Sequence, residues 1–217
     1  MRRAAAEPES RISGMPRYDF LVDTYRTEID KVVSVWAMFD DADLTVRPYP
    51  TDPRGRSLLE QMVHQSVSEH FWFSTMLGIS VTDNPIPSTE TRVAFIRHYV
   101  ENARLRLTEL REREDVWWEA VVPFFEVPRS RAWIMTRRIA HTAHHRGQQI
   151  AQLRMINREL HSTYGPSADT GGLMQHQAPV IYAYPDVDTL LREEQAERHK
   201  TLLPGPGTRP ATERPAR

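Results

Sequence analysis

Two histidines in the second half of the chain have the spacing of a metal-binding pair. His141 and His145 are four residues apart in a segment with a helical apolar pattern, so both side chains point from one face of a helix, one turn apart. Neutral imidazole suits zinc, nickel, copper or ferrous iron better than magnesium or calcium. A solvated or hydrogen-bonded histidine pair is the alternative, because histidine is often only partly buried. The spacing therefore makes His141 and His145 candidate ligands of one divalent ion.

A third ligand to the same ion must come from another helix. A catalytic mononuclear site usually has three protein ligands and keeps one position for water or substrate. The segment Val63–Trp72 offers His64 and His70, which are six residues apart and therefore lie on different faces of a helix. Helix geometry alone does not decide between them. Glu69 lies in the same segment and could support a ligand as a carboxylate, although we expect it at the surface.

Other polar residues near these histidines have ordinary structural alternatives. His144 lies about 60° around the helix from the centre of the pair's stripe and is expected at its periphery. Gln148 could orient a ligand or substrate, but a structural hydrogen bond fits its position equally well. Arg146 and Arg154 could bind a substrate carboxylate, yet arginines are more often exposed. Four further histidines stand on charged or loop segments and are predicted to lie outside the site: His98, His161, His176 and His199.

Composition narrows the chemistry further. The 217 residues include no cysteine, which excludes disulfides, thiolate nucleophiles and cysteine-ligated zinc or iron–sulfur sites. Any metal must therefore bind to histidine, carboxylate or water ligands. The formal net charge of -1 favours neither nucleic acid nor an anionic membrane as a partner. Residues 1–14 lack the apolar core of a signal peptide, and no run approaches the roughly 18 apolar residues of a membrane span. We therefore expect a cytoplasmic protein.

Long helical patterns separated by helix-breaking loops predict an all-α fold. Apolar residues recur at steps of three or four from Tyr18 to Phe39, and Ser57 to Glu60 has the spacing of a capping box that begins a second helix. A third helix is expected from Ser88, with a charged and solvated distal half at residues 104–113. The fourth spans about 129–160. Four such helices predict an up-and-down four-helix bundle.

The predicted bundle occupies the middle of the chain. We expect a disordered leader at residues 1–16, the bundle at 17–161, a C-terminal extension with a short helix at 162–203, and a disordered tail at 204–217. Residues 117–128 are expected to form an aromatic connector. The fourth helix is apolar on two sides, with Ile134 on one and Ile139 on the other, so something besides the bundle core should cover it. The extension or a second subunit could do so, and we expect a homodimer.

Two motifs resemble the DinB/YfiT-like metalloprotein superfamily. One is a second-helix histidine followed by an acidic residue, His64 to Glu69, and the other is the late H-x-x-x-H-R-G-Q motif, His141 to Gln148. The resemblance covers roughly Tyr18 to Leu160, including the number and order of the helices. It implies that the three metal ligands are His64, His141 and His145. It also implies a four-helix bundle, often dimeric, that binds zinc or nickel and in some members other divalent ions such as iron or manganese.

The resemblance also suggests a reaction class. Characterised members of this superfamily include S-transferases that use low-molecular-weight thiols such as bacillithiol, mycothiol or glutathione, and a thiol-dependent isomerase. A metal-dependent transferase or hydrolase is therefore the first hypothesis, with a thiol or water at the open position of the metal. Because the chain has no cysteine, a transferred thiol must be a cosubstrate. The alternative is a non-catalytic, stress-associated protein whose metal holds helices together. A nucleic-acid accessory role is disfavoured by the near-neutral charge.

Overall fold

The computed structural model describes residues 17–209 and 212 of the chain. The predicted leader at residues 1–16 lies outside this part, as do residues 210–211 and 213–217 of the predicted tail. The long helices are α1 (Asp19–Met38), α2 (Leu58–Phe71), α3 (Arg92–Arg111) and α5 (Arg131–Met155). The smaller elements are a π-helical turn η2 (Trp72–Leu77), the helices α4 (Asp115–Glu119) and α6 (Val187–Glu193), the strands β1 (Val121–Phe124) and β2 (Val127–Ser130), and the 3-10 turns Asp41–Asp43, Ala168–Thr170 and Met174–His176. No helix among the described residues is long and apolar enough to cross a membrane.

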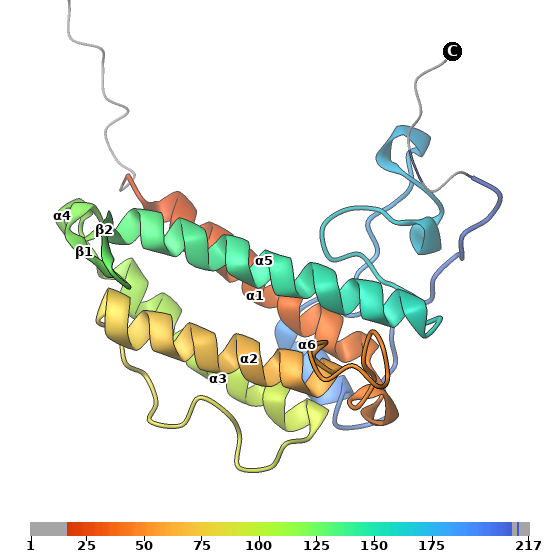
Figure 1. Ribbon diagram of the computed structural model, residues 1–217. Helices are drawn as coiled ribbons and strands as arrows, with labels where there is room; N and C mark the ends of the chain where they lie inside the picture. The colour runs from red at the N-terminus through yellow and green to blue at the C-terminus, as the bar shows by residue number, and fades with distance from the viewer. Residues whose placement is uncertain (1–16, 210–211, 213–217) are drawn as a thin grey trace, which may run out of the picture.

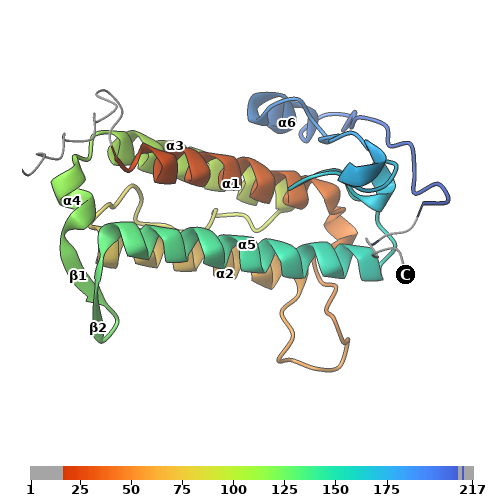
Figure 2. The same cartoon turned by 90° about the horizontal axis from the view of Figure 1, so that it is seen from above.

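The four long helices pack into one bundle, in the order α1, α5, α2, α3 around its axis (Figure 1). Helices α1 and α5 run away from the β1–β2 hairpin, whereas α2 and α3 run toward it (Figure 2). The loop at residues 78–91 follows the length of the bundle to join the parallel α2 and α3. Its 14 residues can span about 45 Å, more than the roughly 30 Å length of α3. The predicted four-helix bundle is confirmed, but its helices do not alternate strictly up and down.

Local sequence signals set the ends of α2. The Ser57 hydroxyl accepts a hydrogen bond from the Glu60 backbone N–H at 3.2 Å, and the Glu60 carboxylate accepts one from the Ser57 N–H at 2.8 Å. This is the predicted capping box. At the other end Gly78 adopts a left-handed conformation, with φ of 69°, and stops the helix after η2. The second helix therefore begins at the predicted capping box and, with η2, ends at Leu77.

The aromatic connector at residues 117–128 has more regular structure than its sequence suggests. It forms most of α4 and an antiparallel hairpin in which Val121 pairs with Ser130 and Phe124 pairs with Val127. Only Phe125 and Glu126 lie between the paired residues, and Phe125 takes a left-handed φ of 53°. The turn lacks the Asn-Gly or Asp-Gly signature that would have predicted a tight hairpin.

Neighbouring helices account for the two apolar sides of α5. The helix lies between α1 and α2, and both Ile139 and Ile150 pack against the core that these helices share. The extension contacts the bundle elsewhere, because α6 packs on α1 and α3. Its buried residues Tyr184 and Leu190 join the hydrophobic core. The apolar sides of α5 therefore do not require a second subunit to bury them, and the homodimer stays a prediction.

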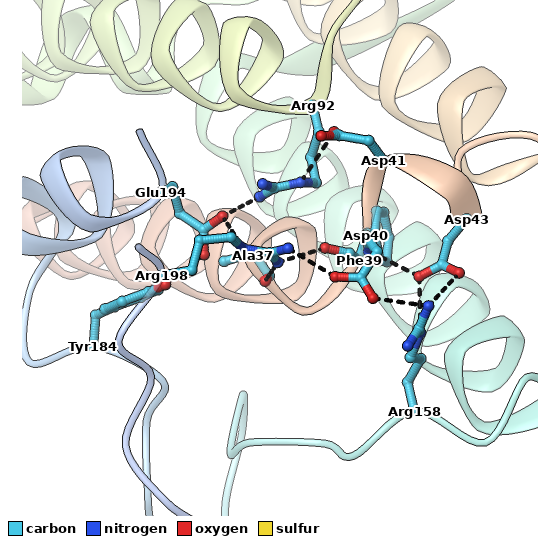
Figure 3. Close-up of polar contacts among 10 residues, drawn as sticks. All are labelled: Ala37, Phe39, Asp40, Asp41, Asp43, Arg92, Arg158, Tyr184, Glu194 and Arg198. Atoms are coloured by element: carbon cyan, nitrogen blue, oxygen red, sulfur yellow. Dashed lines mark hydrogen bonds and ion pairs between the residues drawn. The ribbon is translucent and has the colours of Figure 1, made fainter. Parts of the chain in front are cut away.

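An ion-pair network anchors the extension to the C-terminal end of α1 (Figure 3). The Arg198 guanidinium donates hydrogen bonds to the backbone carbonyls of Ala37 and Phe39, at 3.0 and 2.7 Å, and to the Asp40 carboxylate at 2.7 Å. Carbonyls in the last turn of a helix lack intrahelical partners, so this side chain caps α1. Arg198 also lies 3.0 Å from a carboxylate oxygen of Glu194.

Glu194 is the buried centre of this network. Its carboxylate accepts a hydrogen bond from the Tyr184 hydroxyl at 2.5 Å and is paired with the buried Arg92 at the start of α3. Arg92 also lies 3.4 Å from Asp41, just beyond α1. The extension is thus joined to two helices of the bundle by charges as well as by apolar contacts.

Candidate metal centre

The structure brings His64, His141 and His145 together between α2 and α5. One ring nitrogen from each residue lies within 4.8 Å of the other two. The Nε2 atoms of His141 and His145 are 3.2 Å apart. The ring centroid of His64 is 4.5 Å from that of His145 and 5.4 Å from that of His141. Across residues 17–209 and 212, no other group of three acidic or histidine side chains converges in this way.

Two antiparallel helices position the three rings. His141 and His145 follow one another by one turn on α5, which begins where the Ser130 hydroxyl accepts a hydrogen bond from the Trp133 backbone N–H at 3.2 Å. His64 lies on α2, the neighbour of α5 in the bundle. The two helices are also joined beside the histidines, since the Gln65 amide donates to the Gln149 side-chain oxygen at 2.9 Å. This contact helps to fix how α2 is rotated toward α5.

Two glutamines determine which nitrogen of His145 faces the cluster. His145 Nδ1 lies 2.8 Å from the side-chain oxygen of Gln61 and 3.2 Å from that of Gln148. An amide oxygen only accepts hydrogen bonds, so Nδ1 carries the proton and the lone pair stays on Nε2. The Gln61 amide donates to Gln148 at 2.9 Å, which holds the two glutamines together. Hydrogen bonds of this kind orient metal-binding histidines and raise their basicity.

The ring of His141 is held by stacking. The indole ring of Trp72 lies 5.6 Å from it between centroids, at an interplanar angle of 29°. His141 Nδ1 is buried and has no hydrogen-bond partner among the described residues. Trp72 is the first residue of the π-helical turn η2, where the wider turn changes the register of the helix. Both Trp72 and the next residue, Phe73, are consequently buried.

Burial keeps the three imidazoles neutral. It lowers the pKa of His141 to about 3, with a further contribution from the positive charge of Arg138. Burial likewise lowers the pKa of His145 to about 4, assisted by repulsion from His64 and His144. The pKa of His64 is also lowered, by burial and then by Arg56 and Arg138. All three rings therefore offer a lone pair at neutral pH, which is the state that binds a metal.

The geometry and the donor set fit a divalent ion of the zinc type. In a tetrahedral site with bonds of about 2.0–2.1 Å, two ligand nitrogens are about 3.3 Å apart. The Nε2 atoms of His141 and His145, at 3.2 Å, already have this separation. His64 completes a set of three neutral nitrogen donors, which is the ligand number of a catalytic site with one position open. Such donors suit zinc, nickel, copper or ferrous iron.

The other histidines lie outside this cluster. His144 is exposed, and its Nε2 is 2.8 Å from the Gln148 amide nitrogen. His70, the competing candidate on α2, is not part of the group. Gln148 makes hydrogen bonds to Gln61 and His145, so it has the structural role that was expected as the alternative to orienting a ligand or substrate. The four histidines on charged or loop segments contact backbone carbonyls, a backbone N–H or acidic side chains elsewhere: His98, His161, His176 and His199.

Three expectations of surface exposure were wrong. Glu69 is fully buried and accepts hydrogen bonds from Tyr25 and Tyr99. Arg106, in the half of α3 that was expected to be solvated, is buried against Glu69. Arg146 is buried and paired with Glu28 of α1. In each case a partner on another helix neutralises the charge, and a single helical wheel does not reveal such partners.

Two residues that hold the histidine rings in place, Gln61 and Trp72, were not identified from the sequence. Gln61 precedes His64 by three residues and therefore lies close to it on α2, a spacing that could have suggested a supporting role. Trp72 carries no comparable signal in the sequence, because its position depends on η2.

Arg154, a candidate for binding a substrate carboxylate, is instead paired with the carboxylate of Asp169.

An aromatic rim adjoins the histidines on the side of the hairpin. Phe125 at the hairpin tip is 61% exposed and stacks with the half-exposed Phe71 at 6.4 Å. Phe124 contacts Trp72 and Trp133 edge-on, each at 5.1 Å between ring centroids. Because Trp72 also stacks on His141, the rim is continuous with the histidine cluster. Exposed apolar side chains beside a polar cluster are typical of ligand-binding sites.

The low pKa values predict an unusual pH profile for metal binding. At pH 5.5, three ordinary imidazoles of pKa 6.5 would together cost about a thousandfold in affinity. Here the folded-state pKa values of His141 and His145 are about 3 and about 4, so few protons compete. We expect zinc affinity at pH 5.5 to be less than about tenfold below that at pH 7.5, and to fall as the pH approaches 4. Competition titrations with a calibrated chelator measure this, and a thousandfold loss at pH 5.5 would contradict it.

Comparison with known proteins agrees with this architecture. The DinB family profile matches residues 21–171, more than half of the chain. No curated protein matches the sequence. Among solved structures, the fold is similar to that of a DinB-like protein from Bacillus cereus, with a TM-score of 0.55 and 17% identity, over 67% of this chain and 97% of that one. A DinB-like protein from Bacillus subtilis, YjoA, has a TM-score of 0.49 and 10% identity, over 63% of this chain and 92% of that one. Because the DinB family profile covers more than half of its residues, the chain belongs to the DinB family.

Proposed function

We propose that this protein is a metal-dependent enzyme whose divalent ion is held by His64, His141 and His145. The observation that carries the proposal is the convergence of three neutral imidazole nitrogens, two of them 3.2 Å apart, beside an aromatic rim. Zinc or nickel is the proposed metal, with iron or manganese as alternatives. A homodimer in the cytoplasm is the proposed assembly and location.

The proposed reaction is the transfer of a low-molecular-weight thiol to an electrophilic carbon. The ion, when bound, lowers the pKa of a thiol or water at its open position, so that thiolate or hydroxide is available near neutral pH. The thiol loses its proton, its sulfur forms a bond to carbon, and the leaving group departs with the bonding electrons. The same site with water in place of the thiol would act as a hydrolase.

Residues around the ligands have distinct roles in this proposal. Gln61 and Gln148 hold His145 with Nε2 toward the site, so that the lone pair needs no reorientation when the ion binds. Trp72 fixes the plane of His141. The aromatic rim formed by Phe71 and Phe125 would offer an apolar surface for the electrophile beside the histidine cluster.

A non-catalytic role for the metal is the second candidate. The three histidines join α2 to α5, and His145 is buried, so a bound ion would also crosslink the two helices. In that case the fourth position would be occupied by a protein group or a fixed water, and exogenous ligands would not reach it. The open or closed state of this position therefore distinguishes the two functions.

Cobalt substitution gives a direct test of the open position. We expect the cobalt(II)-loaded protein to develop a sulfur-to-metal charge-transfer band in the near ultraviolet when a small thiol such as glutathione or 2-mercaptoethanol is added. The zinc-loaded protein should then accelerate the reaction of the accepted thiol with a test electrophile. The His144→Ala variant is the matched control, because this exposed histidine lies on the same helix outside the cluster. A cobalt protein whose spectrum no thiol changes would favour the structural role.

A further inference from the structure

A buried charge cluster lies next to the histidines, between the four long helices. Its centre is Glu69 on α2, whose side chain is 0% exposed. The carboxylate accepts hydrogen bonds from the hydroxyls of Tyr25 and Tyr99, at 2.5 and 2.8 Å, and from Arg106 at 2.9 Å. Arg138 of α5, also 0% exposed, lies 3.8 Å from the same carboxylate. Four groups from the three other long helices thus surround one carboxylate.

The charges of this cluster do not cancel. Arg106 and Arg138 carry one positive charge each, Glu69 carries one negative charge, and the two tyrosine hydroxyls are neutral because burial raises their pKa well above the usual value. No other acidic side chain pairs with either arginine among the described residues. The cluster therefore holds a net charge of about +1. A buried, uncompensated charge destabilises a fold by several kcal/mol, so its presence calls for a physical reason.

Arg138 places this excess charge beside the histidines. It precedes His141 by three residues on α5 and points into the bundle on the same side as His145. Its guanidinium donates hydrogen bonds of 3.0 Å to the hydroxyls of Ser68 and Thr142. Ser68 lies one turn after His64 on α2. The guanidinium carbon of Arg138 also lies 5.6 Å from the centre of the Trp72 ring, which stacks on His141. Arg138 thus bridges α2 and α5 directly behind the site.

The histidine ligands themselves add no negative charge. Three neutral imidazoles around a divalent ion leave the full charge of +2 on the centre, unlike sites in which a carboxylate is a ligand. The charged side chains that act most strongly on the pKa values of these histidines are Arg138 and Arg56, both cationic. The one carboxylate of the neighbouring cluster, Glu69, is outnumbered by Arg106 and Arg138, so an anionic fourth ligand would be the main compensation for the charge of a bound ion.

We propose that the Glu69–Arg106–Arg138 cluster makes the open position of the histidine site selective for an anionic ligand. This inference rests on the proposed function and deepens it, since it restricts the fourth ligand to anions such as thiolate, hydroxide or carboxylate. Arg138 is a positioning and electrostatic residue in this proposal, because its guanidinium is already held by Ser68, Thr142 and Glu69. Its charge acts through the protein interior, where screening by salt is weak.

The charge effect has a signature that structural damage cannot imitate. In Arg138→Gln the local positive charge is lost, so zinc should bind about tenfold more tightly while the anion binds about tenfold more weakly. In Glu69→Gln the local charge becomes more positive, so zinc should bind more weakly and the anion more tightly than in the wild-type protein. Arg138→Lys keeps the charge and should stay close to wild type in both affinities. A variant that merely disrupts the site would bind both zinc and the anion more weakly.

The experiment measures two affinities on the same set of proteins. Zinc affinity is obtained by chelator competition, and anion affinity by titration of azide into the cobalt(II)-loaded protein, followed in the visible spectrum in chloride-free buffer at constant ionic strength. Arg92→Gln is the matched control, because it removes a buried arginine that pairs with Asp41 and Glu194 rather than with any residue of the histidine site. We expect it to leave both affinities unchanged.

The possible failures separate the two proposals. If the wild-type protein binds zinc but azide affinity is the same in Arg138→Gln, Glu69→Gln and wild type, the electrostatic inference is overturned and the metal site stands. If Arg138→Gln weakens zinc and azide together while Arg138→Lys does the same, the arginine has a structural role only. If the wild-type protein binds no divalent ion, the proposed function fails and this inference fails with it.

Discussion

The wild-type protein is expected to bind one equivalent of zinc, and the His64→Ala, His141→Ala and His145→Ala variants are each expected to lose it. Each change removes one of the three nitrogen donors that lie within 4.8 Å of one another. A site with two imidazoles loses one of its three bonds to the metal and part of the chelate effect, so the affinity should fall by at least a hundredfold, about 2.7 kcal/mol. Metal analysis of protein purified without a histidine tag, followed by zinc titration, measures the result.

Two further histidine variants serve as controls for this prediction. His144→Ala removes an exposed histidine from the same segment of α5, and His70→Ala removes the competing histidine from α2. Both should keep one equivalent of zinc at nearly wild-type affinity. If His70→Ala loses the ion and His64→Ala keeps it, the third ligand is wrongly assigned. If the parent protein neither copurifies with a metal nor binds one on titration, the histidines have a structural role.

Glu194→Ala is expected to destabilise the protein by about 3–5 kcal/mol, the cost of breaking a buried ion pair. The side chain of Glu194 is 0% exposed and its partner Arg92 is 2% exposed. After the change, Arg92 would retain only the exposed Asp41 at 3.4 Å, and the Tyr184 hydroxyl would lose its acceptor. Chemical denaturation measures the free energy of unfolding, and the thermal midpoint should fall by about 10 °C.

The matched control for Glu194→Ala lies three residues further along the chain. Glu197 is 82% exposed and contacts only the exposed His199, so Glu197→Ala should change the free energy of unfolding by less than about 0.5 kcal/mol. Equal stabilities for Glu194→Ala and wild type would show that the extension is not anchored as the ion-pair network indicates. A large loss in Glu197→Ala would show that charge on this segment acts in another way.

Local patterns along the chain were sufficient for much of this structure. The four long helices follow from apolar periodicity, because each helical face repeats every three or four residues. The start of α2 follows from the capping box at Ser57 and Glu60. The pairing of His141 with His145 follows from the pitch of a single helix. These features depend only on residues within a few positions of one another.

The choice of His64 over His70 was a matter of tertiary structure. Both histidines lie on α2, and the rotation of this helix toward α5 decides which one meets the pair. Contacts such as Gln65 with Gln149 fix that rotation, and these residues are 84 positions apart. Family resemblance had indicated His64, whereas a helical wheel of α2 left the two equivalent.

The buried charges and the course of the chain were likewise decided by packing. Glu69 and Arg106 look like surface residues because each is charged, yet they neutralise one another between α2 and α3. The parallel course of α2 and α3 depends on where the loop at residues 78–91 ends, and its composition specifies only that it is not helical. The sequence by itself determined the helices and the candidate metal-binding pair. Only the tertiary structure decided which distant side chains share the interior, because the partners that compensate buried charges such as Glu69, Arg146 and Glu194 come from distant parts of the chain.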